Sequence, residues 1–268
     1  MRILSALFVA AAMMIALPAF GNDDTIPDVT ERVARISSVD GVVQVRRAET
    51  DEWEQAVLNL PIVEGDEIVA EESGRFEIQF GVDKHLRASE RSVLRIVTLN
   101  DSGVAVSLTR GSVAVTVSKF DSEQSFFEID APKTTVAVQQ AGRYRVDAGT
   151  GIHDAEIRVS VSNGGEARIY SEIAGFTLGD GRIAKVLTTG RNEGEWELAD
   201  ISEYADAFES WVAVRESEIS QRLDSAHFDQ YYDRDIYGAE DLTNYGTWTH
   251  TSDYGYLWRP SSSAIRHY

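Results

Sequence analysis

Short segments in which apolar and polar residues alternate dominate the sequence from Arg32 to about Leu187. The segments are rich in Val, Ile, Phe and Tyr, and turn residues such as Asn163-Gly164-Gly165 separate them. This alternation is typical of half-buried β-strands, and Gly and Asn supply the backbone angles that tight turns need. Clear examples are GVVQVRR (41–47), RFEIQF (75–80), SVAVTV (112–117), RYRVD (143–147) and EIRVSV (156–161). The sequence therefore predicts a mainly β body, built as a sandwich, a barrel or a wound, solenoid-like stack.

The first residues have the features of a secretory signal peptide. Arg2 provides the positive charge, Ile3 to Leu17 the apolar stretch, and Ala19-Phe20-Gly21 a small-x-small cleavage site. Because the apolar stretch is shorter than the roughly 20 residues of a membrane span, we expect cleavage before Asn22 and no membrane-spanning segment. An uncleaved N-terminal anchor is the alternative. We therefore expect a periplasmic or extracellular protein.

Charge and cysteine content exclude several classes of function. The formal net charge is −19, which repels phosphate backbones, so we expect no nucleic-acid binding. The chain has no cysteine, which excludes disulfides, thiolate metal sites and a cysteine nucleophile. A chain of this size can nevertheless build an adequate apolar core without disulfides.

A helical pattern replaces the alternation near Asp200, and it predicts one amphipathic helix over residues 200–225. Asp200 and Glu203 are spaced as a capping box. The expected apolar stripe consists of Ile201, Tyr204, Ala205, Phe208, Trp211, Val212, Ile219 and Leu223. Such a stripe can bind a separate partner or pack against the rest of the chain, and we favour packing against the β body or the tail.

The C-terminal part is rich in aromatic residues and poor in aliphatic ones. Seven of the ten tyrosines lie beyond Phe228. Tyr245-Gly246 precedes Trp248, and Tyr254-Gly255 precedes Trp258 in the same way. We therefore divide the chain into a signal peptide (1–21), a β domain (22–190), the helix (200–225) and a Tyr/Trp-rich region (226–268).

Several motifs in the β body resemble those of the FecR domain, a repeat-like β domain of exported proteins. They are Gly41 to Val45 with Trp53, Val63-Glu64-Gly65-Asp66-Glu67-Ile68, Ser73 to Ile78, Leu108-Thr109-Arg110-Gly111-Ser112-Val113 and Phe127-Glu128-Ile129-Asp130-Ala131-Pro132. One departure is Ala141-Gly142-Arg143-Tyr144-Arg145-Val146, where the family commonly has Gly-Thr before an aromatic-x-Val strand. The helix and tail resemble the region that follows the FecR domain in secreted stand-alone members, in which the aromatic motif continues further.

The resemblance implies a non-enzymatic sensing or binding module of the cell envelope. It does not imply an anti-sigma regulator, because that role requires a membrane span ahead of the domain. We expect no cofactor.

Residues able to support catalysis or bind a metal are not arranged in a recognisable pattern. The sequence lacks the Gly-x-Ser-x-Gly, His-Glu-x-x-His and phosphate-loop motifs, and its five histidines are not at metal-ligand spacing. Those histidines are His85, His153, His227, His250 and His267. An irregular cation site at Asp233, Asp235, Glu240 and Asp241 is conceivable, but we favour a solvated acidic turn and expect no metal.

Six residues of the aromatic region are the candidate binding site: Tyr245, Trp248, Tyr254, Tyr256, Trp258 and Arg259. Three interpretations remain open. The rings can pack over the Phe208 and Trp211 stripe of the helix, form a platform for a polysaccharide, or dock an exported protein. A glycan platform needs coplanar exposed rings, whereas a protein surface would also expose Leu242 and Leu257. We expect a protein that binds a partner or ligand, with envelope scaffolding or carbohydrate hydrolysis as the alternatives.

Overall fold

Strands make up most of the protein. The structure, a computed structural model, describes residues 32–149, 155–201, 206–225, 231, 236, 238 and 241–262, so the predicted signal peptide lies outside it. A single 17-stranded sheet contains β1 to β17, and one long helix and an aromatic hairpin follow. The predicted fold class, a mainly β body followed by a helix and an aromatic tail, is confirmed.

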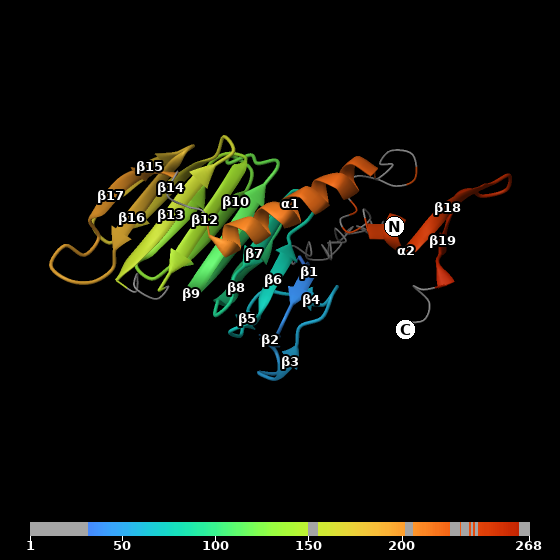
Figure 1. Ribbon diagram of the computed structural model, residues 1–268, viewed down its shortest axis with the longest axis horizontal. Helices are drawn as coiled ribbons and strands as arrows, with labels where there is room; N and C mark the ends of the chain where they lie inside the picture. Colours follow the sequence, from blue (N-terminus) through green and yellow to red (C-terminus); the bar gives the residue numbers. More distant parts are fainter. Residues whose placement is uncertain are drawn as a thin grey trace, which may run out of the picture. The chain divides into compact units, whose positions relative to one another are not determined.

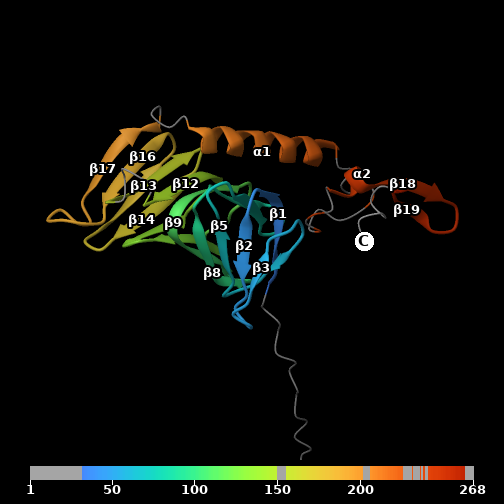
Figure 2. The same cartoon turned by 60° about the horizontal axis from the view of Figure 1, so that its bottom comes forward.

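The 17 strands are arranged in two layers (Figure 1, Figure 2). The layers form one continuous sheet because the central strand β9 (Gly103–Val117) pairs in both. The first layer contains, in order of pairing, β3 (Trp53–Gln55), β2 (Val43–Arg46), β5 (Glu67–Ala70), β8 (Val93–Asn100), β9, β10 (Phe126–Ala131), β11 (Thr134–Val138), β14 (Glu166–Ser171) and β15 (Gly175–Gly179). The second layer contains β4 (Pro61–Ile62), β1 (Ala34–Asp40), β6 (Arg75–Gln79), β7 (Lys84–Ala88), β9, β12 (Gly142–Ala148), β13 (Glu156–Ser162), β16 (Arg182–Leu187) and β17 (Trp196–Asp200).

Hairpins that follow one another in sequence alternate between the layers. The chain therefore advances along the sandwich from β1 to β17, which combines the sandwich and the wound arrangement that the sequence left open. The described pairings are antiparallel except that of β10 with the first half of β9, which is parallel.

The passage of β9 from one layer to the other occurs at Gly111. Residues before Gly111 pair with β8, and residues from Gly111 onward pair with β12. Gly111 has a φ of 100°, and a Cβ atom there would lie 2.2 Å from the Ser92 Oγ. Any side chain would thus meet both backbone strain and a clash, so only glycine suits this position.

One apolar cluster fills the space between the layers, and both layers contribute to it. Val106 and Phe127 come from the first layer, and Val115 and Tyr144 from the second. The Tyr144 hydroxyl crosses to the first layer, where it accepts a hydrogen bond from the Glu166 backbone N–H at 3.1 Å. Each fully buried side chain of this kind stabilises the fold by about 1.5–3 kcal/mol, so the alternation seen in the sequence accounts for the sandwich.

The helix α1 (Ala207–Ser225) lies over the outer face of the second layer (Figure 1, Figure 2). Phe208, Trp211 and Val212 pack there against Ala114 of β9, as the preferred interpretation of the stripe predicted.

The predicted start of the helix at Asp200 is wrong. Asp200 ends β17, where it pairs with Arg182. Asp206 occupies the cap position instead, since its Oδ1 accepts a hydrogen bond from the Glu209 N–H at 2.7 Å. Of the remaining stripe, Tyr204 and Ala205 lie outside the described residues, and Ile219 and Leu223 are half-buried.

The aromatic region forms a separate two-stranded sheet. The short helix α2 (Leu242–Tyr245) leads into β18 (Gly246–Thr251), which pairs with β19 (Gly255–Pro260).

Candidate functional site

The two Tyr-Gly-x-Trp-like motifs meet in the hairpin of β18 and β19. Their register places Trp248 opposite Trp258 and His250 opposite Tyr256. Residues opposite each other, and residues two apart on one strand, share a face of a β-hairpin. Three of the predicted site residues, Trp248, Tyr256 and Trp258, therefore lie on one face.

This aromatic face packs against chain that precedes it. Tyr231 stacks on Trp248 with ring centroids 4.8 Å apart and an interplanar angle of 13°, and it meets Tyr256 edge-on at 4.8 Å. The Trp258 Nε1–H donates a hydrogen bond to the Leu242 carbonyl oxygen at 3.0 Å. Both tryptophans are half-buried as a result.

The other three predicted residues are not on this face. Arg259 lies opposite Thr247 and points to the other side of the hairpin. Tyr254 sits in the turn and is 78% exposed, and Tyr245 at the end of α2 is also exposed. The structure thus groups Trp248, Tyr256 and Trp258, and places Tyr245, Tyr254 and Arg259 around them.

Each glycine of the two motifs has its own structural role. Gly255 has a φ of 70° and allows the tight turn between β18 and β19. Gly246 is extended, but a Cβ atom there would lie 2.6 Å from the Trp258 ring and 2.4 Å from the Arg259 carbonyl oxygen. Gly246 therefore makes room for the Trp258 indole and is not a turn residue.

Phe208 and Trp211 pack against Ala114 of the β body, whereas the packing interpretation placed the hairpin over them. Their rings stack on each other, with centroids 6.0 Å apart. Arginine guanidinium groups from the sheet cover them, Arg145 over Phe208 and Arg75 over Trp211, each at 5.1 Å. The aromatic stripe of the helix is thus used against the β body.

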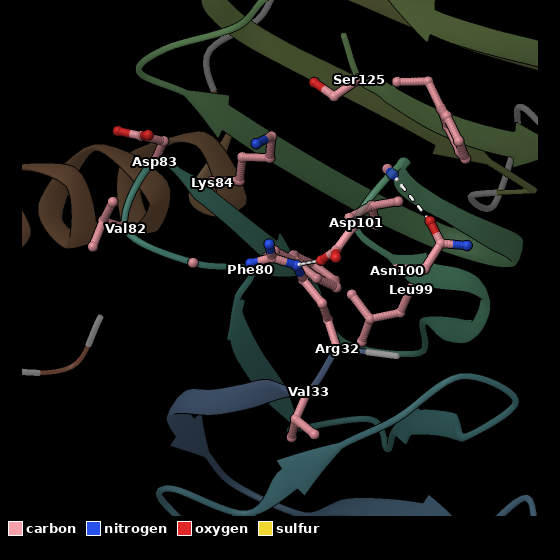
Figure 3. A pocket seen from close by; sticks show the side chains of 14 residues that line it. Arg32, Val33, Phe80, Val82, Asp83, Lys84, Leu99, Asn100, Asp101 and Ser125 are labelled. Atoms are coloured by element: carbon pink, nitrogen blue, oxygen red, sulfur yellow. Dashed lines mark hydrogen bonds and ion pairs between the residues drawn. The ribbon is translucent and has the colours of Figure 1, made fainter. Parts of the chain in front are cut away.

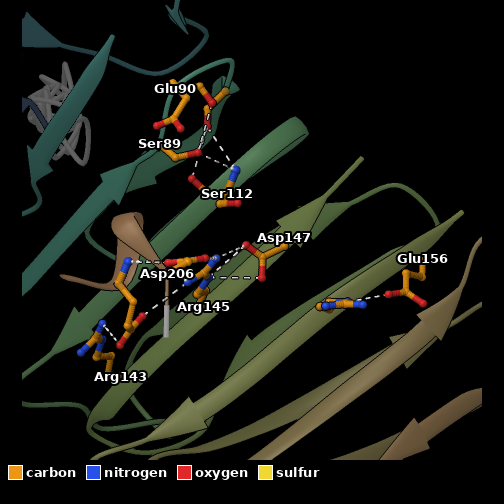
Figure 4. Close-up of polar contacts among 11 residues, drawn as sticks. Ser89, Glu90, Ser112, Arg143, Arg145, Asp147, Glu156 and Asp206 are labelled. Atoms are coloured by element: carbon orange, nitrogen blue, oxygen red, sulfur yellow. Dashed lines mark hydrogen bonds and ion pairs between the residues drawn. The ribbon is translucent and has the colours of Figure 1, made fainter. Parts of the chain in front are cut away.

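A second notable region, which the sequence analysis missed, is the charged seam between α1 and the second layer. Arg145 of β12 forms ion pairs with Asp147 on its own strand at 2.9 Å and with Asp206 ahead of α1 at 2.6 Å (Figure 4). Its neighbour Arg143 pairs with Glu209 and Glu216 of the helix. Desolvation opposes the charge of Arg145, but the two aspartates outweigh it and raise its pKa.

Glu77 of β6 lies at the centre of the same seam. Its carboxylate is 0% exposed and pairs with Arg87 of β7 at 2.7 Å and with Arg215 of α1 at 2.8 Å. Burial would raise the pKa of Glu77, but Arg87 and Arg215 outweigh it and lower the pKa to about 2. The inner part of the seam therefore consists of buried, hydrogen-bonded charges of opposite sign, and the helix acids Glu209 and Glu216 at its edge are partly exposed.

The sequence contained a signal for this seam. Outward positions of three strands carry charged residues in RFEIQF, HLRAS and RYRVD. A solvated sheet face has the same pattern, so only the covering helix distinguishes the two.

Of the four acidic residues considered for an irregular cation site, the structure describes Asp241. The Asp241 carboxylate bridges Arg35 and Arg222, with both contacts at 2.9 Å. Asp233, Asp235 and Glu240 lie outside the described residues. The part of the chain that the structure describes contains no group of three or more His, Asp or Glu side chains able to hold a metal ion.

The histidines are scattered. His85 is buried beside Glu77, and desolvation lowers its pKa to about 4. His250 belongs to the hairpin, and His153, His227 and His267 fall outside the described residues. Among the described helices, none is long and apolar enough to cross a membrane.

Residues 66–165 match the model of the FecR protein family. No curated protein matches the chain. A crystal structure of a candidate anti-sigma factor from Parabacteroides distasonis is similar over 74% of this chain and 87% of its own, with 14% identity and a TM-score of 0.43. A second structure of such a factor from that organism covers 73% and 99%, with the same identity and TM-score. The matched segment runs from the turn before β5 to the turn after β13, and these residues form a FecR domain, the family that the motifs predicted.

Proposed function

We propose that this protein is an exported, non-enzymatic binding and sensing module of the cell envelope, and that its aromatic hairpin contacts an exported protein partner. The observation that carries the proposal is the outer surface of the hairpin. Tyr254, Tyr256 and Leu257 are 78%, 42% and 46% exposed there, and Tyr245 is exposed at the open end of the hairpin. Exposed tyrosines with a large apolar side chain among them are typical of protein-binding surfaces.

A polysaccharide is the second candidate, and the ring geometry favours it less. A glycan platform needs flat rings with open faces, but Tyr231 stacks in parallel on Trp248. The exposed part of the hairpin is instead mixed, with Leu257 on the opposite face from Tyr256. A protein partner can cover such a two-sided surface.

The fully buried carboxylate of Glu77 does not suit the role of a general acid. A hydrolase that cleaves glycosidic bonds needs one acid with a raised pKa to protonate the leaving group. Arg87 and Arg215 hold the pKa of Glu77 at about 2, so this group stays ionised. Its chemistry is that of a structural ion pair.

Site-specific photo-crosslinking in cells tests the docking proposal. A photo-reactive amino acid at position 254 should yield a covalent product with an exported protein, and Leu257→Ser should abolish it without lowering the melting temperature. The same probe at Tyr170, which is 48% exposed on β14, is the matched control. Equal products at 254 and 170 would overturn the proposal. Tryptophan fluorescence titration with envelope polysaccharides tests the second candidate, and saturable binding lost in Tyr254→Ser would favour it.

Export has its own test. Mass spectrometry of the protein purified from cells should show an N-terminus at Asn22, and fractionation should place it outside the cytoplasm. A cytoplasmic protein that retains Met1 or Arg2 would refute export.

A further inference from the structure

A hollow of about 590 Å³ opens at one end of the FecR-domain sandwich (Figure 3). Its walls come from the turn between β6 and β7 (80–84), the turn between β8 and β9 (99–104), the start of β10 (125–126) and the residues Arg32 and Val33 ahead of β1. A volume of this size is typical of sites for small molecules.

The floor of the hollow is apolar and continuous with the core. Phe80, Leu99 and Val104 line it, and all three are core residues that are nearly buried. The Phe80 ring also packs edge-on against Phe127, with centroids 5.9 Å apart, so this floor is held in place from behind.

Lys84 introduces a positive charge where the alternation of β7 would place a core residue. Leu86 and Ala88, which follow at alternate positions, belong to the core, and so does Val117, the residue paired with Lys84. Lys84 therefore starts on the inner side of the layer, and its ammonium group lies at the wall of the hollow. Burial lowers the pKa of Lys84, and Arg32 nearby acts in the same direction.

The acidic groups of the hollow do not neutralise this ammonium group by direct contact. The Asp101 carboxylate pairs with Arg32 (Figure 3). Asp83 raises the pKa of Lys84, but the two side chains extend to opposite sides of the chain in Figure 3. Among the described residues, no acceptor lies within hydrogen-bonding or ion-pairing distance of the Lys84 Nζ.

We propose that this hollow binds a small organic anion with an apolar body, such as an aromatic or medium-chain carboxylate. The charged group of the ligand pairs with Lys84, and its apolar part covers Phe80, Leu99 and Val104. A partly desolvated ammonium group gains most from a ligand that supplies both a negative charge and shielding from water. This site lies in the FecR domain and is separate from the proposed docking surface of the hairpin.

Backbone NMR of the full chain tests the proposal with benzoate and decanoate as probes. Both should give saturable shifts at the amides of Gly81 and Gly103, which line the hollow, and none at Gly190, which does not. Benzyl alcohol, which has the ring without the charge, should bind at least about tenfold more weakly. Absent shifts with both carboxylates, or equal affinity for benzoate and benzyl alcohol, would overturn the assignment.

Substitutions of Lys84 test whether its ammonium group is the positive charge that pairs with the ligand. Lys84→Gln should weaken carboxylate binding about tenfold, Lys84→Arg should largely retain it, and Lys185→Gln in β16 is the matched control. Similar affinities of Lys84→Gln and Lys185→Gln, with both proteins folded, would contradict the role of Lys84. Tyr254→Ser should leave these shifts unchanged, so this proposal and the hairpin proposal can fail independently. If Lys84→Gln does not fold, the comparison of benzoate with benzyl alcohol still tests whether the hollow prefers a carboxylate.

Discussion

Glu77 and Arg87 occupy positions that a two-layer sandwich normally leaves to solvent, yet they are 0% and 1% exposed. The covering helix removes their water, and their mutual contact together with Arg215 replaces it. A buried ion pair of this kind adds little net stability compared with apolar packing, but removing one member leaves an uncompensated charge.

Glu77→Gln should therefore lower the free energy of unfolding by about 3–5 kcal/mol, because Arg87 and Arg215 lose their common counter-charge. Urea denaturation of the variant and of the parent protein measures the difference. Glu72→Gln is the control, since Glu72 pairs with Arg91 at the surface and should change stability by less than about 1 kcal/mol. Equal effects of the two substitutions would contradict the buried network.

The same seam predicts that acid destabilises the fold in two steps. His85 is neutral in the folded protein, with a pKa of about 4 against 6.5 in a model peptide. Between these two values the unfolded state binds one more proton than the folded state, so the stability decreases as the pH is lowered. The pKa of Glu77 drops from 4.5 to about 2, so its contribution, roughly 3 kcal/mol, is lost as pH falls through that window.

Urea unfolding at intervals from pH 7 to pH 3 measures this dependence. His85→Gln should flatten the curve between pH 6.5 and 4, and His250→Gln in the hairpin should not. A curve unchanged by His85→Gln would show that other groups cause the acid sensitivity.

Gly246→Ala should disrupt the hairpin although its backbone angles suit any residue. The added Cβ would meet the Trp258 ring and the Arg259 carbonyl oxygen, so the indole must move away from Leu242. Near-UV circular dichroism should show the loss of fixed tryptophan packing. Gly255→Asn is the comparison, because nothing lies within 4 Å of its Cβ position and Asn tolerates positive φ. An unaltered spectrum for Gly246→Ala would refute this account of the motif.

At the scale of the element, α1 contacts the sheet through as many charged residues as apolar ones. Its described apolar contribution is Phe208 and Val212 with Trp211 beside them, whereas Glu209, Arg215 and Glu216 all pair with the sheet. The sequence predicted the existence of the helix and its aromatic stripe. It did not predict the ionic half of the interface, because charged residues on a helix are ordinarily solvated.

Replacing the acids of this interface should loosen the helix without unfolding the sandwich. The triple variant Asp206→Asn, Glu209→Gln, Glu216→Gln should speed hydrogen exchange of the α1 amides at least about tenfold and leave those of β12 and β13 unchanged, because local opening exposes only the helix. Glu218→Gln is the control, since Glu218 pairs with Arg215 on the helix itself. Equal acceleration in helix and strands would indicate global destabilisation instead.

At the scale of the whole molecule, the sequence predicted the composition of the fold better than its connections. Alternation identified the strands, and the FecR motifs identified the family whose model matches residues 66–165. The division of β9 between two layers at Gly111 and the parallel pairing of β9 with β10 depend on contacts between distant segments. Periodicity reports which face of a strand is buried and contains no information on which strand lies beside it. The candidate site shows the same limit, since Trp248 and Trp258 meet through register and Arg259 does not.

The sandwich should not depend on the hairpin for its stability. The main core cluster draws its buried side chains from Ala34 to Val186, and the second from Ala114, Phe208 and Val212. Asp241 links Arg35 to Arg222 just before α2. A chain ending at Asp241 keeps both clusters and this bridge, so its free energy of unfolding should fall by less than about 1 kcal/mol, within the range of changes away from a core.

Urea denaturation of the truncated protein tests this independence, and Asp241→Asn in the full chain shows what the bridge alone contributes. A loss of about 3 kcal/mol or more on truncation would mean that the hairpin packs as part of the core. The conserved stability expected here would leave the exposed rings of Tyr254 and Tyr256 without a role in folding. Their exposure then agrees with the binding role proposed for the hairpin.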